Sequence, residues 1–117
     1  MRILVVDDDP RVLSVCVDAL ADMGYPAEAF PRGEPALEAV ADEPPDLLVL
    51  NWNLPGIDGV EVTRRARQLQ QGLRILMITG HPAEAAGPAL GAGVLQVLTK
   101  PFTVDAFATA VRSALEA

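Results

Sequence analysis

The chain has 117 residues and a formal net charge of −7, and 50% of its residues are hydrophobic while only 4% are aromatic. This length suits one globular domain with an aliphatic core that needs no disulfide or metal ion for its stability. The acidic surface, without a basic stripe, argues against direct binding of nucleic acid or of an anionic membrane.

The chain opens with an apolar strand followed by a helix. Residues 3–6 are apolar and end abruptly in acidic residues, which predicts a buried strand. A helix is predicted over residues 10–23, because Asp9 can cap it, Pro10 suits its first turn and Gly24 ends it.

The same alternation continues through the middle of the chain. Residues 26–30 form a weaker candidate strand, and a short helix is predicted over residues 35–41. A continuous apolar run over residues 46–50 predicts a third strand, and residues 58–71 predict a helix that Gly72 ends. Continuous apolar runs indicate strands that are buried on both faces of a sheet.

The fourth helix is the weakest prediction. Strands are expected at residues 74–78 and 94–98, and the alanine-rich segment between them contains Gly87 and Pro88. Inside a helix, proline costs roughly 3 kcal/mol and glycine about 1 kcal/mol relative to alanine. We therefore expect any helix here to be short or broken.

An apolar stripe near the chain end predicts a last helix that packs on the sheet. The stripe consists of Val104, Phe107, Ala108, Val111 and Leu115. Alternating strands and helices indicate an α/β fold, with a parallel sheet, right-handed crossovers and helices on both faces. In such open sheets the functional crevice lies at the carboxyl ends of the strands.

The remaining signals concern location. Cys16 is the only cysteine, so no intramolecular disulfide forms, and its helical spacing among apolar residues predicts burial. The apolar stretch at the start is too short for a signal peptide, and no apolar run reaches membrane-spanning length. We expect a cytoplasmic protein with no membrane partner.

Polar residues gather where four of the predicted strands end. These residues are Asp7, Asp8, Asn51, Thr79 and Lys100. Carboxylates favour a hard cation such as Mg²⁺, while a lysine and a hydroxyl can bind phosphate oxygens. The combination predicts the handling of phosphate and a divalent metal.

Four motifs in order resemble the receiver domains of bacterial two-component systems. They are Ile-Leu-Val-Val-Asp-Asp-Asp, Leu-Leu-Val-Leu-Asn-Trp-Asn-Leu-Pro-Gly-Ile-Asp-Gly, Met-Ile-Thr-Gly-His and Leu-Thr-Lys-Pro-Phe. The resemblance covers essentially the whole chain. It implies a flavodoxin-like, doubly wound sheet of five parallel strands in the order 2-1-3-4-5, with about five helices. It also implies a single receiver domain over residues 1–117, whether complete or cut from a longer response regulator.

The resemblance assigns roles to the polar residues. In this family an aspartate at the end of the third strand takes a phosphoryl group from a histidine kinase. Asp7, Asp8 and the backbone carbonyl of Asn53 match the Mg²⁺ ligands. Thr79 matches the residue that senses the acyl phosphate, and Lys100 the residue that pairs with it, with a cis peptide bond expected before Pro101.

The sequence departs from this pattern at the phosphate-accepting position, where it has Asn51. A carboxamide carries no charge and is a feeble nucleophile, so ordinary aspartyl phosphorylation is not expected. Mg²⁺ binding should be weak, since one anionic ligand is lost. Val97 stands where the family usually has a tyrosine or phenylalanine whose rotation reports phosphorylation.

Three functions are compatible with these residues. The leading hypothesis is a non-enzymatic signalling module that binds other proteins independently of phosphorylation: a histidine kinase, an output domain, another receiver, or a second copy of itself. The alternative is an ordinary phosphate-accepting receiver with an engineered or recent change of aspartate to Asn51. A remote alternative is a small phosphohydrolase of the haloacid dehalogenase type that uses Asp7 as its nucleophile.

Overall fold

A computed structural model gives the fold and describes residues 1–85 and 87–117. Five parallel strands, β1 (Ile3–Val6), β2 (Ala27–Phe30), β3 (Leu47–Asn51), β4 (Ile75–Thr79) and β5 (Gln96–Thr99), form one sheet in the order β2-β1-β3-β4-β5. Five helices alternate with them: α1 (Pro10–Asp22), α2 (Gly33–Asp42), α3 (Gly59–Leu69), α4 (Pro82–Ala92) and α5 (Val104–Glu116). The predicted fold class and strand order are confirmed.

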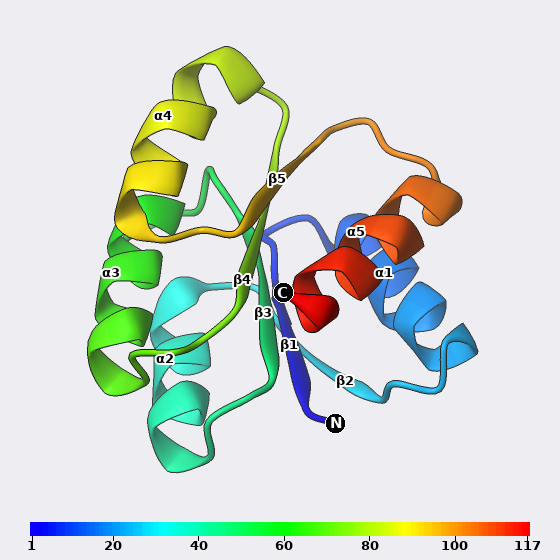
Figure 1. The fold of residues 1–117 in the computed structure, drawn as a ribbon, viewed down its shortest axis with the longest axis horizontal. Coiled ribbons are helices and arrows are strands. Elements are labelled where there is room, and N and C mark those ends of the chain that lie inside the picture. Colours follow the sequence, from blue (N-terminus) through cyan, green and yellow to red (C-terminus); the bar gives the residue numbers. More distant parts are fainter.

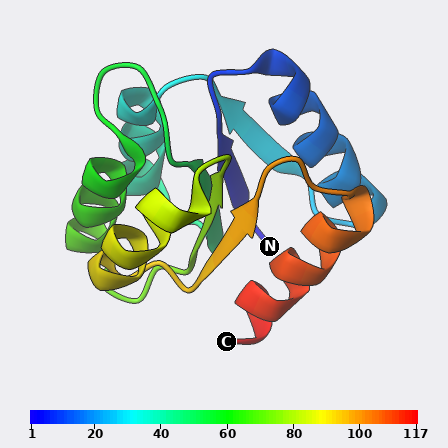
Figure 2. The same ribbon diagram turned by 90° about the horizontal axis from the view of Figure 1, so that it is seen from above.

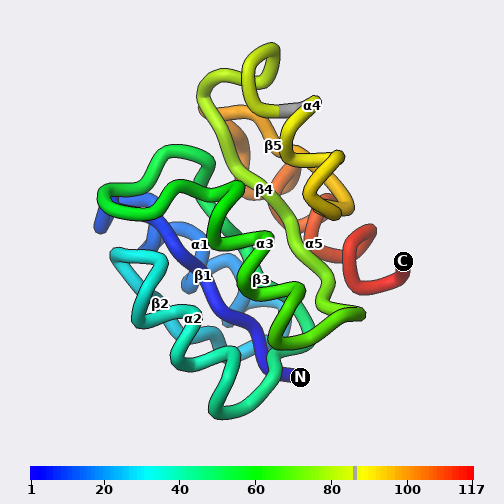
Figure 3. Tube along the Cα trace, turned by 90° about the vertical axis from the view of Figure 1, so that its left-hand side faces the viewer, coloured from blue at the N-terminus to red at the C-terminus, as the bar shows by residue number. Residues whose placement is uncertain are grey.

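The helices form two layers around the sheet. Figure 1 shows α1 and α5 on one face and α2, α3 and α4 on the other, and Figure 2 shows the sheet edge-on between these layers. Figure 3 faces the layer of α2, α3 and α4. Each face therefore has its own apolar core, which explains the continuous apolar runs in the central strands.

Burial follows this layering. Every residue of β1, β3 and β4 is buried, whereas the edge strands β2 and β5 consist of half-buried and exposed residues. The core against α1 and α5 includes Phe107 and the free Cys16, both 0% exposed. Met77 lies in the core of the opposite face. The predicted burial of Cys16 is confirmed.

Three strands end one residue later than the sequence predicts. Asn51 pairs with Ile78 in the ladder between β3 and β4, and Thr79 pairs with Thr99 between β4 and β5. The polar side chains are therefore part of the strands and not of the loops behind them. Parallel pairing requires only backbone groups, so a polar residue at a strand end costs nothing in the ladder.

Side-chain caps set where three of the helices begin. The carboxylate of Asp9 accepts a hydrogen bond from the backbone N–H of Arg11 at 2.9 Å, which confirms the predicted cap of α1. The carboxylate of Asp58 caps α3 and the hydroxyl of Thr103 caps α5 in the same way. In the part of the chain that the structure describes, no helix is long and apolar enough to cross a membrane.

The buried face of the last helix only partly matches the predicted stripe, which included Val104 and omitted Ala110 and Ala114. Phe107, Ala110, Val111 and Ala114 form its buried face, whereas Val104 is 52% exposed. Val104 follows the capping residue Thr103 directly and is the first residue of α5. The apolar stripe gave the correct helix but extended its buried face by one turn.

The fourth helix continues through Pro88, where the sequence predicted a short or broken helix. It is assigned as a single helix over Pro82–Ala92 with Pro88 inside it, eleven residues long like α3. Pro88 has no N–H to donate to the preceding turn, so the hydrogen bonding is interrupted although the helix is not shortened. Ala85 and Ala89 are both 0% exposed, and this burial offsets the poor helix propensity.

Gly59 allows α3 to begin close to the end of β3. Its N–H donates to the carbonyl oxygen of Trp52 at 3.0 Å. A Cβ atom at Gly59 would lie 2.7 Å from the backbone oxygen of Asn51 and 3.0 Å from the Cα of Trp52. Only glycine fits here without moving the backbone that carries Asn51.

Gly59→Ala should therefore lower the free energy of unfolding by about 2 kcal/mol, since the clash is with backbone and not with a flexible side chain. Urea unfolding followed by circular dichroism measures this. The control is Gly72→Ala, where no atom lies within 4 Å of the added Cβ. An equal effect of both substitutions would contradict the close approach.

Candidate functional site

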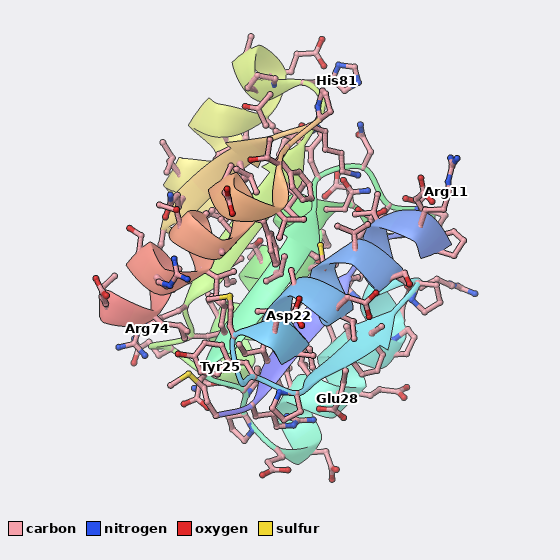
Figure 4. The ribbon with its side chains drawn as sticks, turned by 90° about the vertical axis from the view of Figure 1, so that its right-hand side faces the viewer. Arg11, Asp22, Tyr25, Glu28, Arg74 and His81 are labelled. Atoms are coloured by element: carbon pink, nitrogen blue, oxygen red, sulfur yellow. The ribbon has the colours of Figure 1, made fainter. Side chains whose placement is uncertain are left out.

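The predicted site residues lie together at the carboxyl edge of the sheet. Asp7 follows β1, Asn51 ends β3, Thr79 ends β4 and Lys100 follows β5. Because all the strands are parallel, these ends share one edge. In Figure 4, Arg11 and His81, which follow the ends of β1 and β4, lie at one end of the molecule, while Tyr25, Glu28 and Arg74 lie toward the other.

A partly buried ion pair joins the residues that follow the first and last strands. The Nζ of Lys100 lies 2.8 Å from the Oδ2 of Asp7, whose side chain is 1% exposed. The Oδ1 of Asp7 accepts a hydrogen bond from the N–H of Asp9 at 2.9 Å. Burial raises the pKa of the Asp7 carboxyl above its ordinary value, and the hydrogen bond from Lys100 only partly offsets this.

Lys100 is itself held by the backbone around it. Its N–H donates to the carbonyl oxygen of Thr79 at 2.7 Å, which continues the pairing of β4 and β5 by one step. The Lys100–Pro101 peptide bond is cis, as predicted. The ammonium group is therefore directed at Asp7 from a defined backbone position.

Asn51 makes two hydrogen bonds within the same pocket. Its Nδ2 donates to the Oδ1 of Asp8 at 3.2 Å and to the carbonyl oxygen of Asn53 at 2.7 Å. A carboxylate and a backbone carbonyl are both acceptors, so the NH₂ side of the carboxamide faces them. Since Asn51 is 6% exposed, its side chain is enclosed as well as hydrogen-bonded.

The oxygen atoms expected to bind Mg²⁺ are therefore engaged by other groups. The amide of Asn51 bonds to one carboxylate oxygen of Asp8 and to the carbonyl of Asn53, while Asp7 accepts from Lys100 and from the N–H of Asp9. Among the residues that the structure describes, no group of three or more His, Cys, Asp and Glu side chains is placed to hold a metal ion. In this arrangement the donor set does not fit Mg²⁺.

Thr79 is fully buried, and its hydroxyl forms a hydrogen bond with the backbone two residues later in the chain. Its Oγ1 accepts a hydrogen bond from the N–H of His81 at 2.9 Å. His81 itself is exposed and makes no side-chain cap on α4. Thr79 thus holds the loop between β4 and α4 at the edge of the site.

Val97 and Trp52 lie on the α2, α3 and α4 face of the sheet. Val97 pairs with Met77 in the ladder of β4 and β5. Both Val97 and Trp52 are half-buried against the core of that face. A β-branched valine has one strongly restricted side-chain torsion, so it lacks the wide rotation of an aromatic ring at this position.

A groove beside the site was not predicted from the sequence. It has a volume of about 430 Å³ and runs between the start of α1 and the loop after β5. Its lining consists of Asp9, Arg11, Val12, Val15, Lys100, Pro101 and Phe102. One lining residue, the apolar Val15 on α1, is 44% exposed. The groove could not be predicted from it, because only the fold brings the loop after β5 next to α1.

The family model of the response regulator receiver domain matches residues 3–112. The chain belongs to this family. Receiver domains are regulatory signalling modules that interact with histidine kinases and output domains and typically bind Mg²⁺ at the phosphorylation site. The family predicted from the four sequence motifs is thereby confirmed.

Curated relatives agree with this assignment. The response regulator MprA of Mycobacterium avium is 38% identical over 116 residues, which cover 98% of this chain and 51% of that protein. The DNA-binding transcriptional regulator NtrC of Escherichia coli is 34% identical over 112 residues, 95% of this chain and 24% of that protein. The receiver domain thus spans about half the length of MprA and a quarter of NtrC.

Solved structures show the same architecture. The CheY-like receiver domain protein of Methanospirillum hungatei superposes with a TM-score of 0.92 at 28% identity, over 98% of this chain and 93% of that one. The receiver domain of NtrX from Brucella abortus gives a TM-score of 0.92 at 31% identity, over 97% and 98% of the two chains.

The ion pair of Asp7 and Lys100 generates a pH-dependent prediction. Lys100→Met should lower the free energy of unfolding by about 3 kcal/mol at about pH 8, because it leaves an ionised carboxylate buried without its partner. It also removes an effect that lowers the pKa of Asp7. In the variant, Asp7 then keeps its proton to a higher pH in the folded state than in the unfolded state. The stability of the variant therefore falls as pH rises from the unfolded-state pKa of Asp7 to its higher folded-state pKa.

The loss caused by Lys100→Met should therefore be smaller at about pH 5 than at about pH 8. Urea unfolding at both pH values measures it, in buffer with a chelator. Asp7→Asn combined with Lys100→Met is the control, since it removes the buried charge and should recover most of the loss at the higher pH. A loss that is the same at both pH values would contradict the unpaired carboxylate as its cause.

Proposed function

We propose that this receiver domain works as a protein-interaction module of a two-component system without aspartyl phosphorylation. The observation that carries the proposal is the state of Asn51 at the acceptor position. Its carboxamide is 6% exposed and donates to Asp8 and to the carbonyl of Asn53. A phosphoryl group would have to be captured by the amide oxygen, which carries no charge and is a poor nucleophile.

The neighbouring residues support the same conclusion. Lys100 is paired with Asp7, and the hydroxyl of Thr79 accepts from the N–H of His81. These residues are thus occupied with one another and with the backbone. Such a network stabilises one conformation instead of two. Val97 adds to this, since its stiff side chain cannot report a change in the pocket by a large rotation.

The partners that we propose are signalling proteins: a histidine kinase, an output domain, another receiver domain or a second copy of this one. The net charge of −7 supports an interaction with proteins and opposes direct contact with nucleic acid or an anionic membrane. We propose a cytoplasmic location. We also propose that residues 1–117 form one domain, which can belong to a longer response regulator, since the MprA relatives are about twice its length.

A second candidate function has its own support. Asp7, Asp8, Thr79 and Lys100 all occupy the positions that phosphoryl transfer in this family requires. An ordinary phosphate-accepting receiver with an engineered or recent change to Asn51 would have this composition. Nothing in the geometry favours the remote alternative of a phosphohydrolase, because Asp7 is buried and both of its oxygens accept hydrogen bonds.

The test is incubation with acetyl phosphate and Mg²⁺, followed by mass spectrometry of the intact protein. The wild-type chain should gain no phosphoryl group, because no carboxylate lies at the acceptor position. The Asn51→Asp variant should gain one if the rest of the pocket is competent. Asn53→Asp is the matched control, since it adds a carboxylate at an exposed position two residues away.

The outcomes separate the candidates. A phosphoryl adduct on the wild-type chain, at residue 51 or a neighbour, would contradict the proposed function. Phosphorylation of Asn51→Asp alone would support a pocket altered only at its acceptor, as the second candidate requires. An Asn51→Asp variant that stays inert would indicate that the loss of phosphoryl transfer extends beyond residue 51.

A further inference from the structure

We infer that the carboxamide of Asn51 takes the place of the divalent cation in this pocket, and does more than remove an anionic ligand. Its Nδ2 lies 3.2 Å from the Oδ1 of Asp8 and 2.7 Å from the carbonyl oxygen of Asn53. These are two of the three oxygen ligands that the family assigns to the metal. One NH₂ group therefore bridges, with its two hydrogens, the atoms that a cation would otherwise bridge.

The chemistry of the acceptors makes this arrangement specific. A carboxylate and a backbone carbonyl have no hydrogens, so each can pair only with a donor, a water molecule or a cation. Asp8 and Asn53 are exposed, whereas the Asn51 side chain that bridges them is buried. The NH₂ group of Asn51 carries the partial positive charge that both require. If the carboxamide turned its oxygen toward them, three acceptors would face one another and both hydrogen bonds would be lost.

The charges of the pocket point in the same direction. The third oxygen ligand, Asp7, is already paired with Lys100 at 2.8 Å. With a neutral residue at position 51, one net negative charge remains among Asp7, Asp8 and Lys100, instead of two in a receiver with its aspartate. One amide hydrogen of Asn51 faces the carboxylate of Asp8, and the other faces the carbonyl oxygen of Asn53.

Entry of Mg²⁺ would have a double cost in this pocket. The cation would have to displace the NH₂ group from both acceptors, and the carboxamide would have to turn over before its oxygen could serve as a ligand, since Mg²⁺ prefers oxygen. Asn51 is also enclosed, at 6% exposed, and its backbone is fixed at the end of β3. The side chain therefore has little room to move aside.

If the amide of Asn51 occupies the place of the cation, the pocket needs no divalent cation. This inference concerns the same residues as the proposed function. It rests on hydrogen bonds and not on phosphoryl transfer. Its test uses MgCl₂ alone, without any phosphodonor, so either idea can fail without the other.

The experiment compares Mg²⁺ binding by wild type, Asn51→Ala and Asn51→Asp, using isothermal titration calorimetry at constant ionic strength. If loss of the anion alone weakened the site, Asn51→Ala would bind Mg²⁺ no better than wild type. Because the amide blocks the two ligands, we expect Asn51→Ala to bind about tenfold tighter than wild type, which corresponds to about 1.4 kcal/mol. Asn51→Asp should bind tighter still, since it adds an anionic oxygen.

Thermal unfolding gives the second readout. Added MgCl₂ should raise the midpoint of Asn51→Ala and of Asn51→Asp, because a ligand of the folded state stabilises it, and should leave wild type unchanged. Gln68→Ala is the matched control, since it removes an exposed amide on α3 and should behave as wild type does. Equal Mg²⁺ affinity of wild type and Asn51→Ala would overturn the inference, and so would Mg²⁺ binding by wild type as tight as that of Asn51→Asp.

Nuclear magnetic resonance of the wild-type chain keeps the inference testable if Asn51→Ala does not fold. The two side-chain amide protons of Asn51 should exchange slowly with water and keep their chemical shifts when MgCl₂ is added. Fast exchange of these protons, or a shift that saturates with Mg²⁺, would show that the cation displaces the amide and would overturn the inference.

Discussion

Buried carboxylates at the end of a parallel sheet need partners, and this constraint shapes the functional end of the molecule. The fold buries Asp7 at this edge, so both of its oxygens must be met by a cation or a donor, while the neighbouring Asp8 remains exposed. Lys100 meets Asp7 and the amide of Asn51 meets Asp8. The pocket is thus completed by the protein's own groups.

The rest of the fold keeps these partners in place. Gly59 lets α3 start directly against the backbone of Asn51 and Trp52, so the loop that contains Asn53 stays close to β3. The pairing of β4 with β5 continues to Lys100 and fixes the direction of its side chain. The local backbone and the polar network therefore stabilise each other, as is common where buried polar groups are fully paired.

In this chain the residues at the carboxyl edge of the sheet form hydrogen bonds with one another. In the family, an aspartate, a cation and a phosphoryl group join at this edge, and the pocket exists in two states. Here Asn51 ends β3, and its neutral side chain donates hydrogen bonds to Asp8 and to the carbonyl of Asn53. The groove lined by Val12, Val15 and Phe102 lies between the start of α1 and the loop after β5.

The sequence by itself determined the fold class, the order of elements and the convergence of Asp7, Asp8, Asn51, Thr79 and Lys100. These follow from periodicity, capping residues and the rule for parallel sheets, all of which act locally or by simple topology. It also determined that residue 51 lacks a nucleophilic anion, which is a property of the residue type. Even the cap at Asp9 was predictable, because its hydrogen bond is made two residues away.

Tertiary structure alone decided how these residues pair. The ion pair of Asp7 and Lys100 joins residues 93 positions apart, and the bond from Asn51 to Asp8 spans 43. The sequence offered several donors for each carboxylate and no means to choose among them, since the choice depends on strand register. The same limit applies to α4, where burial of Ala85 and Ala89 outweighed the local preference of Gly87 and Pro88 for a break.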